Sequence, residues 1–150
     1  MNTDIAAKKG AMIAKYLWAT GSIILLLLGS VHLYLTFFTT SFSLANEKLI
    51  SDMKASSPIL SQKITLWKAW IGFNGSHSSG LVFIGGLNAY LALRHFALLQ
   101  ADHFIVGFTL LTICFYVWLA ANYWFIVPFA GLIIALICCT SAYILILINR

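Results

Sequence analysis

Charged residues are scarce in this chain of 150 residues. Only 9% of the residues are charged, whereas 61% are hydrophobic and the mean hydropathy is +0.94. A soluble domain carries roughly a quarter charged residues, because water must solvate its surface. A water-soluble fold of this composition would expose large apolar patches and would associate. The composition therefore excludes an ordinary soluble domain and predicts an integral membrane protein.

Acidic residues are the rarest charged type, and none falls within a long apolar segment. The carboxylates are Asp4, Glu47, Asp52 and Asp102. A proton-coupled pump or cation transporter usually places a carboxylate in the middle of the membrane. A hydrolytic triad also needs an acid that orients its base. The sequence disfavours both classes.

Several signatures of metal, redox and nucleotide chemistry are also missing. The three cysteines, Cys114, Cys138 and Cys139, show no CxxC spacing, so neither a disulfide framework nor a zinc site is indicated. Phosphate-cradling loops and HExxH motifs are absent. The net charge is +5, but the Lys and Arg residues are scattered around the ends of apolar segments rather than gathered on one basic face. We therefore expect no nucleic-acid partner and lean against an enzyme.

What the chain does contain is four apolar segments, each long enough to cross a bilayer. A span needs about 20 residues at a rise of 1.5 Å per residue. The predicted spans cover residues of about 16–38, 67–98, 104–121 and 128–148. Aromatic residues near their ends fit an interfacial belt: Trp18, Trp67, Trp70, Trp118, Tyr123 and Trp124. The pattern predicts an all-α, four-transmembrane-helix up-and-down bundle that forms a single transmembrane domain over residues 1–150.

The polar loop, at about residues 39–66, contains one amphipathic stretch. Between Phe42 and Met53, apolar side chains share one helical face and charged side chains the other. This periodicity predicts a short amphipathic interfacial helix in the first loop. Ser57 and Pro58 should end it, and Pro58 is a suitable first residue for the next helix.

The orientation follows from Lys and Arg in the short loops. An inner amino terminus places Lys8, Lys9, Lys15, Arg94 and Arg150 inside. The outer side then holds Lys48, Lys54, Lys63 and Lys68, all near the longest loop. The balance favours cytoplasmic N- and C-termini in a bacterial inner membrane.

Two histidines lie inside predicted spans, where ionisable groups are costly and usually face the bundle interior. His32 precedes the end of the first span by about two turns, and His77 follows the start of the second by the same length. Each imidazole should lie ~10 Å below the same membrane surface. Neighbouring antiparallel helices would bring the two rings together.

Other polar residues on the same helical faces complete a predicted ligand pocket in the outward half of the bundle. They are Thr36 on the first span, Asn74, Ser78 and Asn88 on the second, and Tyr116 on the third. On the fourth span, the small residues Gly131, Ala135, Cys138 and Ala142 recur at helical spacing. This stripe predicts a packing seam.

Several functions remain open for the His32 and His77 pair. The two imidazoles could simply form hydrogen bonds between helices. They could bind a lipid-like or small hydrophobic ligand in a non-enzymatic protein or accessory subunit. They could instead be the axial ligands of a b-type haem, or His77 could be the acid or base of a small membrane enzyme. The expected partners are the lipid bilayer, such a ligand, and a homo-oligomer or larger membrane complex.

Overall fold

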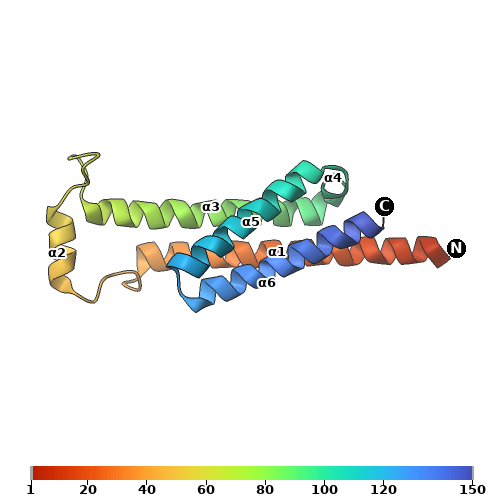
Figure 1. Ribbon diagram of the computed structural model, residues 1–150, viewed down its shortest axis with the longest axis horizontal. Coiled ribbons are helices and arrows are strands. Elements are labelled where there is room, and N and C mark those ends of the chain that lie inside the picture. Colours follow the sequence, from red (N-terminus) through yellow and green to blue (C-terminus); the bar gives the residue numbers. More distant parts are fainter. Residues whose placement is uncertain (1, 150) are drawn as a thin grey trace. The chain divides into compact units, whose positions relative to one another are not determined.

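The computed structural model describes residues 2–149, and their regular structure is entirely helical (Figure 1). The elements in chain order are α1 (Asn2–Phe38), α2 (Glu47–Ala55), α3 (Leu66–Arg94), α4 (Phe96–Ala101), α5 (His103–Tyr123) and α6 (Ile126–Ile148). The predicted all-helical class is confirmed within these residues, which contain no strand.

Three helices are long and apolar enough to cross a membrane. They are the Ala7–Phe38 part of α1, α5 and α6. Large side chains on these helices face outward: Phe108 is 61% exposed and Ile137 is 59% exposed. Side chains of this kind are soluble in lipid but not in water. The three helices therefore suit a small membrane protein.

The fourth predicted span corresponds to α3, which has 29 residues. Its length is sufficient, because about 20 residues cross the hydrocarbon core. Its composition is more polar than that of the other three, owing to the segment from Asn74 to Ser79. For this reason α3 is not among the helices that length and composition together mark as spans.

The end of α3 differs from the predicted end of the second span for an identifiable reason. The second span was expected to continue to about residue 98, but α3 ends at Arg94 and α4 begins at Phe96. Between them His95 adopts a non-helical backbone, with φ −135° and ψ 41°, while its imidazole Nε2 lies 3.1 Å from the Tyr90 hydroxyl.

The loop helix α2 begins at Glu47, later than the amphipathic pattern suggests. The Asn46 side chain caps it, since its Oδ1 accepts hydrogen bonds from the backbone N–H groups of Lys48 and Leu49 at 3.0 and 3.3 Å. Pro58 does not begin a helix, and α3 starts only at Leu66.

The chain divides into two compact units, whose boundaries fall within α1 and α3. The loop unit is Gly29–Leu81, and the hairpin unit combines Met1–Leu28 with Val82–Arg150. In the loop unit, the end of α1 and the start of α3 run antiparallel, and α2 lies across their ends (Figure 1).

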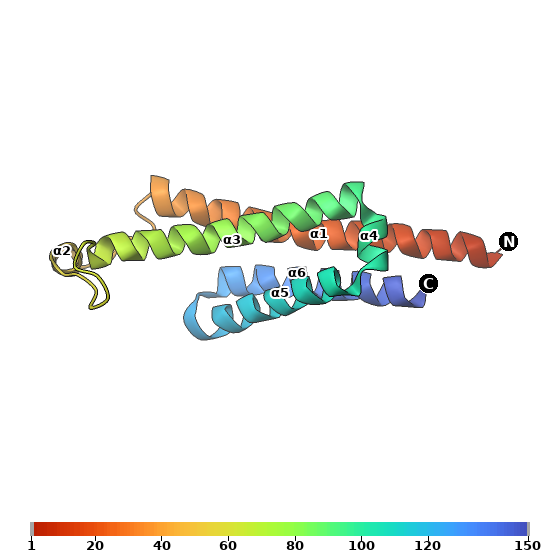
Figure 2. The ribbon, with the colours of Figure 1, turned by 90° about the horizontal axis from the view of Figure 1, so that it is seen from above.

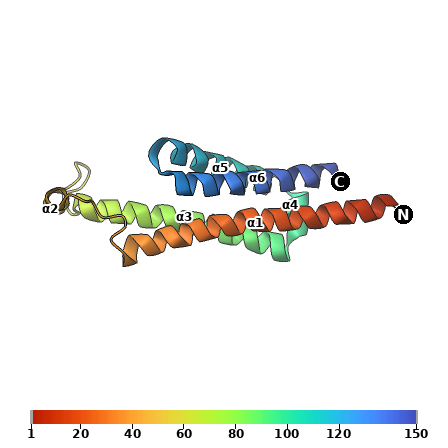
Figure 3. The same cartoon turned by 90° about the horizontal axis from the view of Figure 1, so that it is seen from below.

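In the hairpin unit, α5 and α6 run antiparallel and side by side (Figure 2 and Figure 3). A Cβ atom at Gly21 of α1 would lie 2.7 Å from the Cys139 sulfur and 2.9 Å from the Ala135 carbonyl oxygen. Ala135, Cys139 and Ala142 are fully buried. Of the predicted packing seam, Ala135 and Ala142 are therefore buried, whereas Cys139 is buried in place of Cys138, and Gly131 is only half-buried.

Candidate functional site

The candidate site lies in the loop unit and begins with a hydrogen bond between α1 and α3. His32 Nε2 is 3.2 Å from Asn74 Oδ1. The Asn74 amide nitrogen donates to the Trp70 carbonyl oxygen at 2.9 Å, so the amide oxygen is the atom that faces His32. An amide oxygen only accepts, and Nε2 of His32 must therefore carry the proton of this bond. In the neutral ring, Nδ1 is left as an acceptor.

His77 completes the pair. Its ring centroid is 5.7 Å from that of His32, and the planes meet edge to face at 66°. The structure thus brings together the two histidines that the sequence places at equal depth.

One phenylalanine ring lies against each of the two imidazoles. The Phe42 ring lies against His32, with centroids 4.4 Å apart. Phe73, one helical turn before His77, stacks on it at 6.3 Å and 10°. The contact of Phe42 with His32 was not predicted, because Phe42 was assigned to the loop helix. Nothing in the sequence indicates that Phe42 folds back towards His32.

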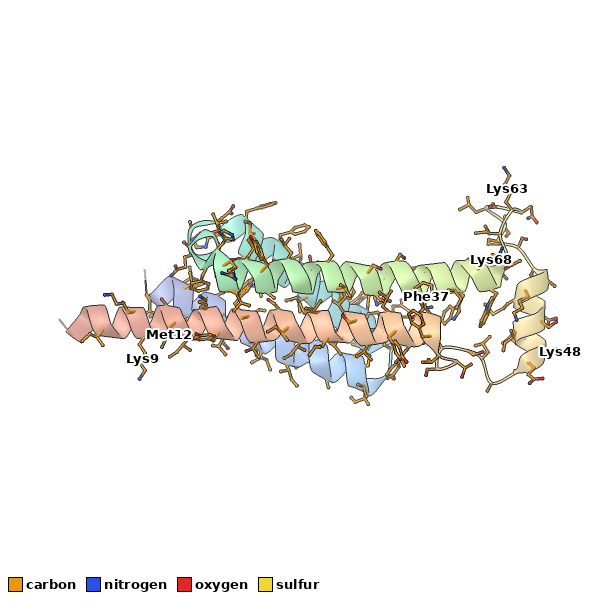
Figure 4. All side chains as sticks on the ribbon, turned by 180° about the vertical axis from the view of Figure 1, so that it is seen from behind. Lys9, Met12, Phe37, Lys48, Lys63 and Lys68 are labelled. Carbon is orange, nitrogen blue, oxygen red and sulfur yellow. The ribbon has the colours of Figure 1, made fainter. Side chains whose placement is uncertain are left out.

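A side-chain contact holds Phe42 in this position. The indole N–H of Trp70 donates to the Phe42 carbonyl oxygen at 3.3 Å, which ties the segment after α1 to α3. Nearby, a Cβ atom at Gly75 would lie 2.9 Å from the tip of the Phe37 ring. Figure 4 labels Phe37 on the last turn of α1. Glycine at position 75 therefore permits this close packing of α1 and α3 within the loop unit.

Two of the predicted pocket residues use their hydroxyl protons locally. The Thr36 hydroxyl donates to the His32 carbonyl oxygen at 2.8 Å, and the Ser78 hydroxyl donates to the Asn74 carbonyl oxygen. Both side chains are buried. Each hydroxyl could meet a ligand only through its remaining lone pairs.

The other two predicted pocket residues belong to the hairpin unit. Asn88 is buried, and its Oδ1 accepts from the Trp18 indole N–H at 3.1 Å and from the Thr109 hydroxyl at 3.2 Å. The ring of Tyr116 lies 6.2 Å from that of Trp124. Asn88 joins three helices within this unit, which is a structural role.

Trp18 was expected in an interfacial aromatic belt, and that expectation is wrong. The side chain is fully buried in the protein and donates to Asn88. Trp118 and Tyr123 are 52% and 70% exposed, as belt residues should be. A tryptophan near a span end can face either the lipid or the protein interior, and its position in the sequence does not distinguish the two.

The described residues contain no group of three or more His, Cys, Asp or Glu side chains that could hold a metal ion. Two axial histidines of one haem face each other across the flat porphyrin, with their ligating nitrogens about 4 Å apart at about 2 Å per bond. Here His32 Nε2 lies 3.2 Å from Asn74 Oδ1, so only Nδ1 of that ring is left for a metal. The arrangement is that of a hydrogen-bonded aromatic cluster.

The chain was compared with protein families, curated proteins and solved structures. It matches none of them.

Proposed function

We propose that this chain is a non-enzymatic membrane protein that binds a lipid-like ligand at His32, Asn74 and His77, as a carrier or as the accessory subunit of a membrane complex. The observation that supports this most strongly is the convergence of two imidazoles and an amide, with a phenylalanine ring against each imidazole. The imidazole pair spans 5.7 Å between ring centroids, and the amide oxygen of Asn74 is 3.2 Å from His32 Nε2.

The proposal includes α3 as a fourth span, placed in the membrane beside the end of α1. The side chains of Asn74, Ser76, Ser78 and Ser79 each donate a hydrogen bond to a carbonyl oxygen three or four residues earlier in α3. Polar groups satisfied by their own helix are much less costly in lipid than unpaired ones. The charged residues of α3, Lys68 and Arg94, lie near its two ends, where long side chains reach the interface.

The chemistry of the cluster favours an amphiphile with a small polar head. In a neutral imidazole, one ring nitrogen donates and the other accepts, so His32 and His77 can supply both kinds of hydrogen bond. Phe42 and Phe73 offer apolar faces for the rest of the ligand. A hydroxyl or carbonyl head on an apolar body, as in an isoprenoid quinone or a diacylglycerol, matches both features.

The direct test is mass spectrometry of the lipids and quinones that copurify with the protein in detergent. We expect wild type to retain one amphiphile in defined stoichiometry, and His32→Ala and His77→Ala each to lose it at least tenfold. The double variant should lose little more, because the two residues form one site. His95→Ala is the matched control and should retain the ligand, since His95 contacts Tyr90 in the hairpin unit.

Other outcomes would refute this function in distinguishable ways. Equal retention by all variants, or additive losses in the double variant, would exclude a shared ligand site. A Soret band that either substitution abolishes would identify His32 and His77 as haem ligands and indicate electron transfer instead. Turnover of the bound amphiphile that requires His77 would make the protein an enzyme.

A further inference from the structure

The connection between α2 and α3 carries an unusual apolar tip. The Ser61 N–H donates to the Pro58 carbonyl oxygen at 3.1 Å, which closes a turn with Ile59 and Leu60 at its centre. Their side chains are 101% and 97% exposed. Central turn positions usually hold Gly, Asn, Asp or Ser, because these residues suit both the backbone and contact with water. Two large aliphatic residues at this place indicate an apolar environment around the tip.

Contacts at its base fix where this tip is displayed. The Leu66 N–H donates to the Ser56 carbonyl oxygen at 2.9 Å, so the two ends of the connection are joined. The Lys54 ammonium lies over the Trp67 ring, 5.7 Å from its centroid. The tip therefore projects from the place where α2 meets the start of α3 (Figure 4).

The helix beside the tip has the orientation of a helix at a membrane surface. Figure 1 shows α2 lying across the ends of the α1 and α3 segments of the loop unit. If those segments cross the membrane, α2 runs in the plane of its surface. None of its residues is buried, and Leu49 is 46% exposed. The tip and α2 then lie at the level of the lipid headgroups.

Basic side chains gather around the tip. Figure 4 labels Lys63 in the connection and Lys68 at the start of α3, and Lys54 lies in the last turn of α2, whereas Lys48 lies at the other end of α2. These lysines outnumber the acidic residues of the same segment, Glu47 and Asp52. Lysines beside inserted apolar side chains attract anionic headgroups.

We infer that Ile59 and Leu60 insert into the bilayer interface and that the surrounding lysines bind anionic phospholipid headgroups, so that this connection anchors the loop unit to one leaflet. The inference depends on the proposed membrane crossing by α1 and α3, but not on ligand binding at His32 and His77. We favour lipid as the partner of Ile59 and Leu60. These side chains, α2 and the nearby lysines all lie at the same end of the α1 and α3 segments of the loop unit.

The test uses the full chain in vesicles, with a nitrobenzoxadiazole fluorophore on Leu60→Cys after replacement of Cys114, Cys138 and Cys139 by alanine. Ser51→Cys, on the exposed polar side of α2, is the control position. In vesicles that contain phosphatidylglycerol, lipid with a doxyl group near the headgroup should quench the label at position 60 several-fold more than at position 51. Combining Lys54→Gln, Lys63→Gln and Lys68→Gln should reduce that difference at least twofold.

Three results would overturn the inference. Equal quenching at positions 60 and 51 would place the tip in water. Blue-shifted but unquenched emission that grows with the ratio of protein to lipid would show that a second copy covers the tip. Release of the unlabelled wild-type chain from vesicles by alkaline carbonate would refute the membrane crossing itself, whereas a chain that stays with the vesicles but is not quenched contradicts only the anchoring.

Discussion

At the scale of single residues, most polar side chains in the long helices bond the backbone of their own helix. Thr36, Ser78 and Thr112 donate to carbonyl oxygens four residues earlier. A smaller set of hydrogen bonds joins side chains of different helices, and these bonds constrain the tertiary structure. They include His32 with Asn74 in the loop unit, and Asn88 with Trp18 and Thr109 in the hairpin unit.

Asn88 is the residue whose removal should weaken the hairpin unit most clearly. Asn88→Ala deprives the buried Trp18 indole and the Thr109 hydroxyl of their shared acceptor. Hydrogen bonds between membrane helices average about 0.6 kcal/mol and reach about 1.7 kcal/mol. We expect the free energy of unfolding in mixed micelles, measured by titration with dodecyl sulfate, to fall by about 1–2 kcal/mol.

Asn122 provides a matched control, because its exposed amide donates only to the Trp118 carbonyl oxygen of its own helix. Asn122→Ala should change the free energy of unfolding by less than about 0.5 kcal/mol. Equal effects of the two substitutions would contradict a specific role for Asn88.

The sequence was sufficient to expect His32, His77 and Asn74 near one another, but not the phenylalanine rings beside the two imidazoles. Helical periodicity and distance from the span ends were sufficient to place His32 and His77 together. Phe42 reaches His32 only because the chain turns back after α1, and turns of this kind leave no periodic signal. The hydrogen bond between Trp18 and Asn88 was not predicted either. Trp18 lies near a span end, which is typical of an interfacial residue, and the sequence does not show that its side chain faces the protein interior.

At the scale of elements, close contact between helices depends on glycines at particular positions. A Cβ atom at Gly85 of α3 would lie 2.8 Å from both the Leu26 Cα and the Ser22 carbonyl oxygen of α1, and it would also meet the Leu26 backbone nitrogen. These are backbone atoms, which cannot move aside without separating the helices.

We expect Gly85→Ala to destabilise the protein by about 1–3 kcal/mol, as overpacking does, although alanine favours helix formation. Thermal unfolding in detergent, followed by circular dichroism, measures the effect. Gly86→Ala is the control, because its nearest neighbour would be a Leu26 methyl group at 3.9 Å. That variant should be neutral or more stable, and a destabilisation as large as that of Gly85→Ala would contradict the packing argument.

Helix boundaries were predictable where composition changes abruptly and not where a single side chain decides them. Phe38 ends both the apolar segment and α1, and α6 follows the apolar run to Ile148. The start of α2 depends instead on the Asn46 cap, and the end of α3 on the backbone of His95. Neither the Asn46 cap nor the His95 backbone conformation can be predicted from average hydrophobicity.

At the scale of the whole molecule, the class of protein follows from composition, whereas the number of spans depends on α3. Three helices meet the requirement for crossing a membrane by length and composition. Asn74 and His77, which lower the hydropathy of α3, are also residues of the candidate site. The single transmembrane domain of the sequence prediction therefore stays a prediction, and so do the inner-membrane location and the cytoplasmic termini.

The side of the membrane reached by the α3–α5 connection tests the central claim most directly. Alkaline phosphatase, active only outside, and green fluorescent protein, fluorescent only inside, can be fused in parallel after Ala55, Gln100, Trp124 and Asn149. Four spans with an inner amino terminus predict an outer signal after Ala55 and Trp124 and an inner signal after Gln100 and Asn149. If Gln100 reports the same side as Ala55, α3 does not cross, and His77 cannot belong to a site within the membrane.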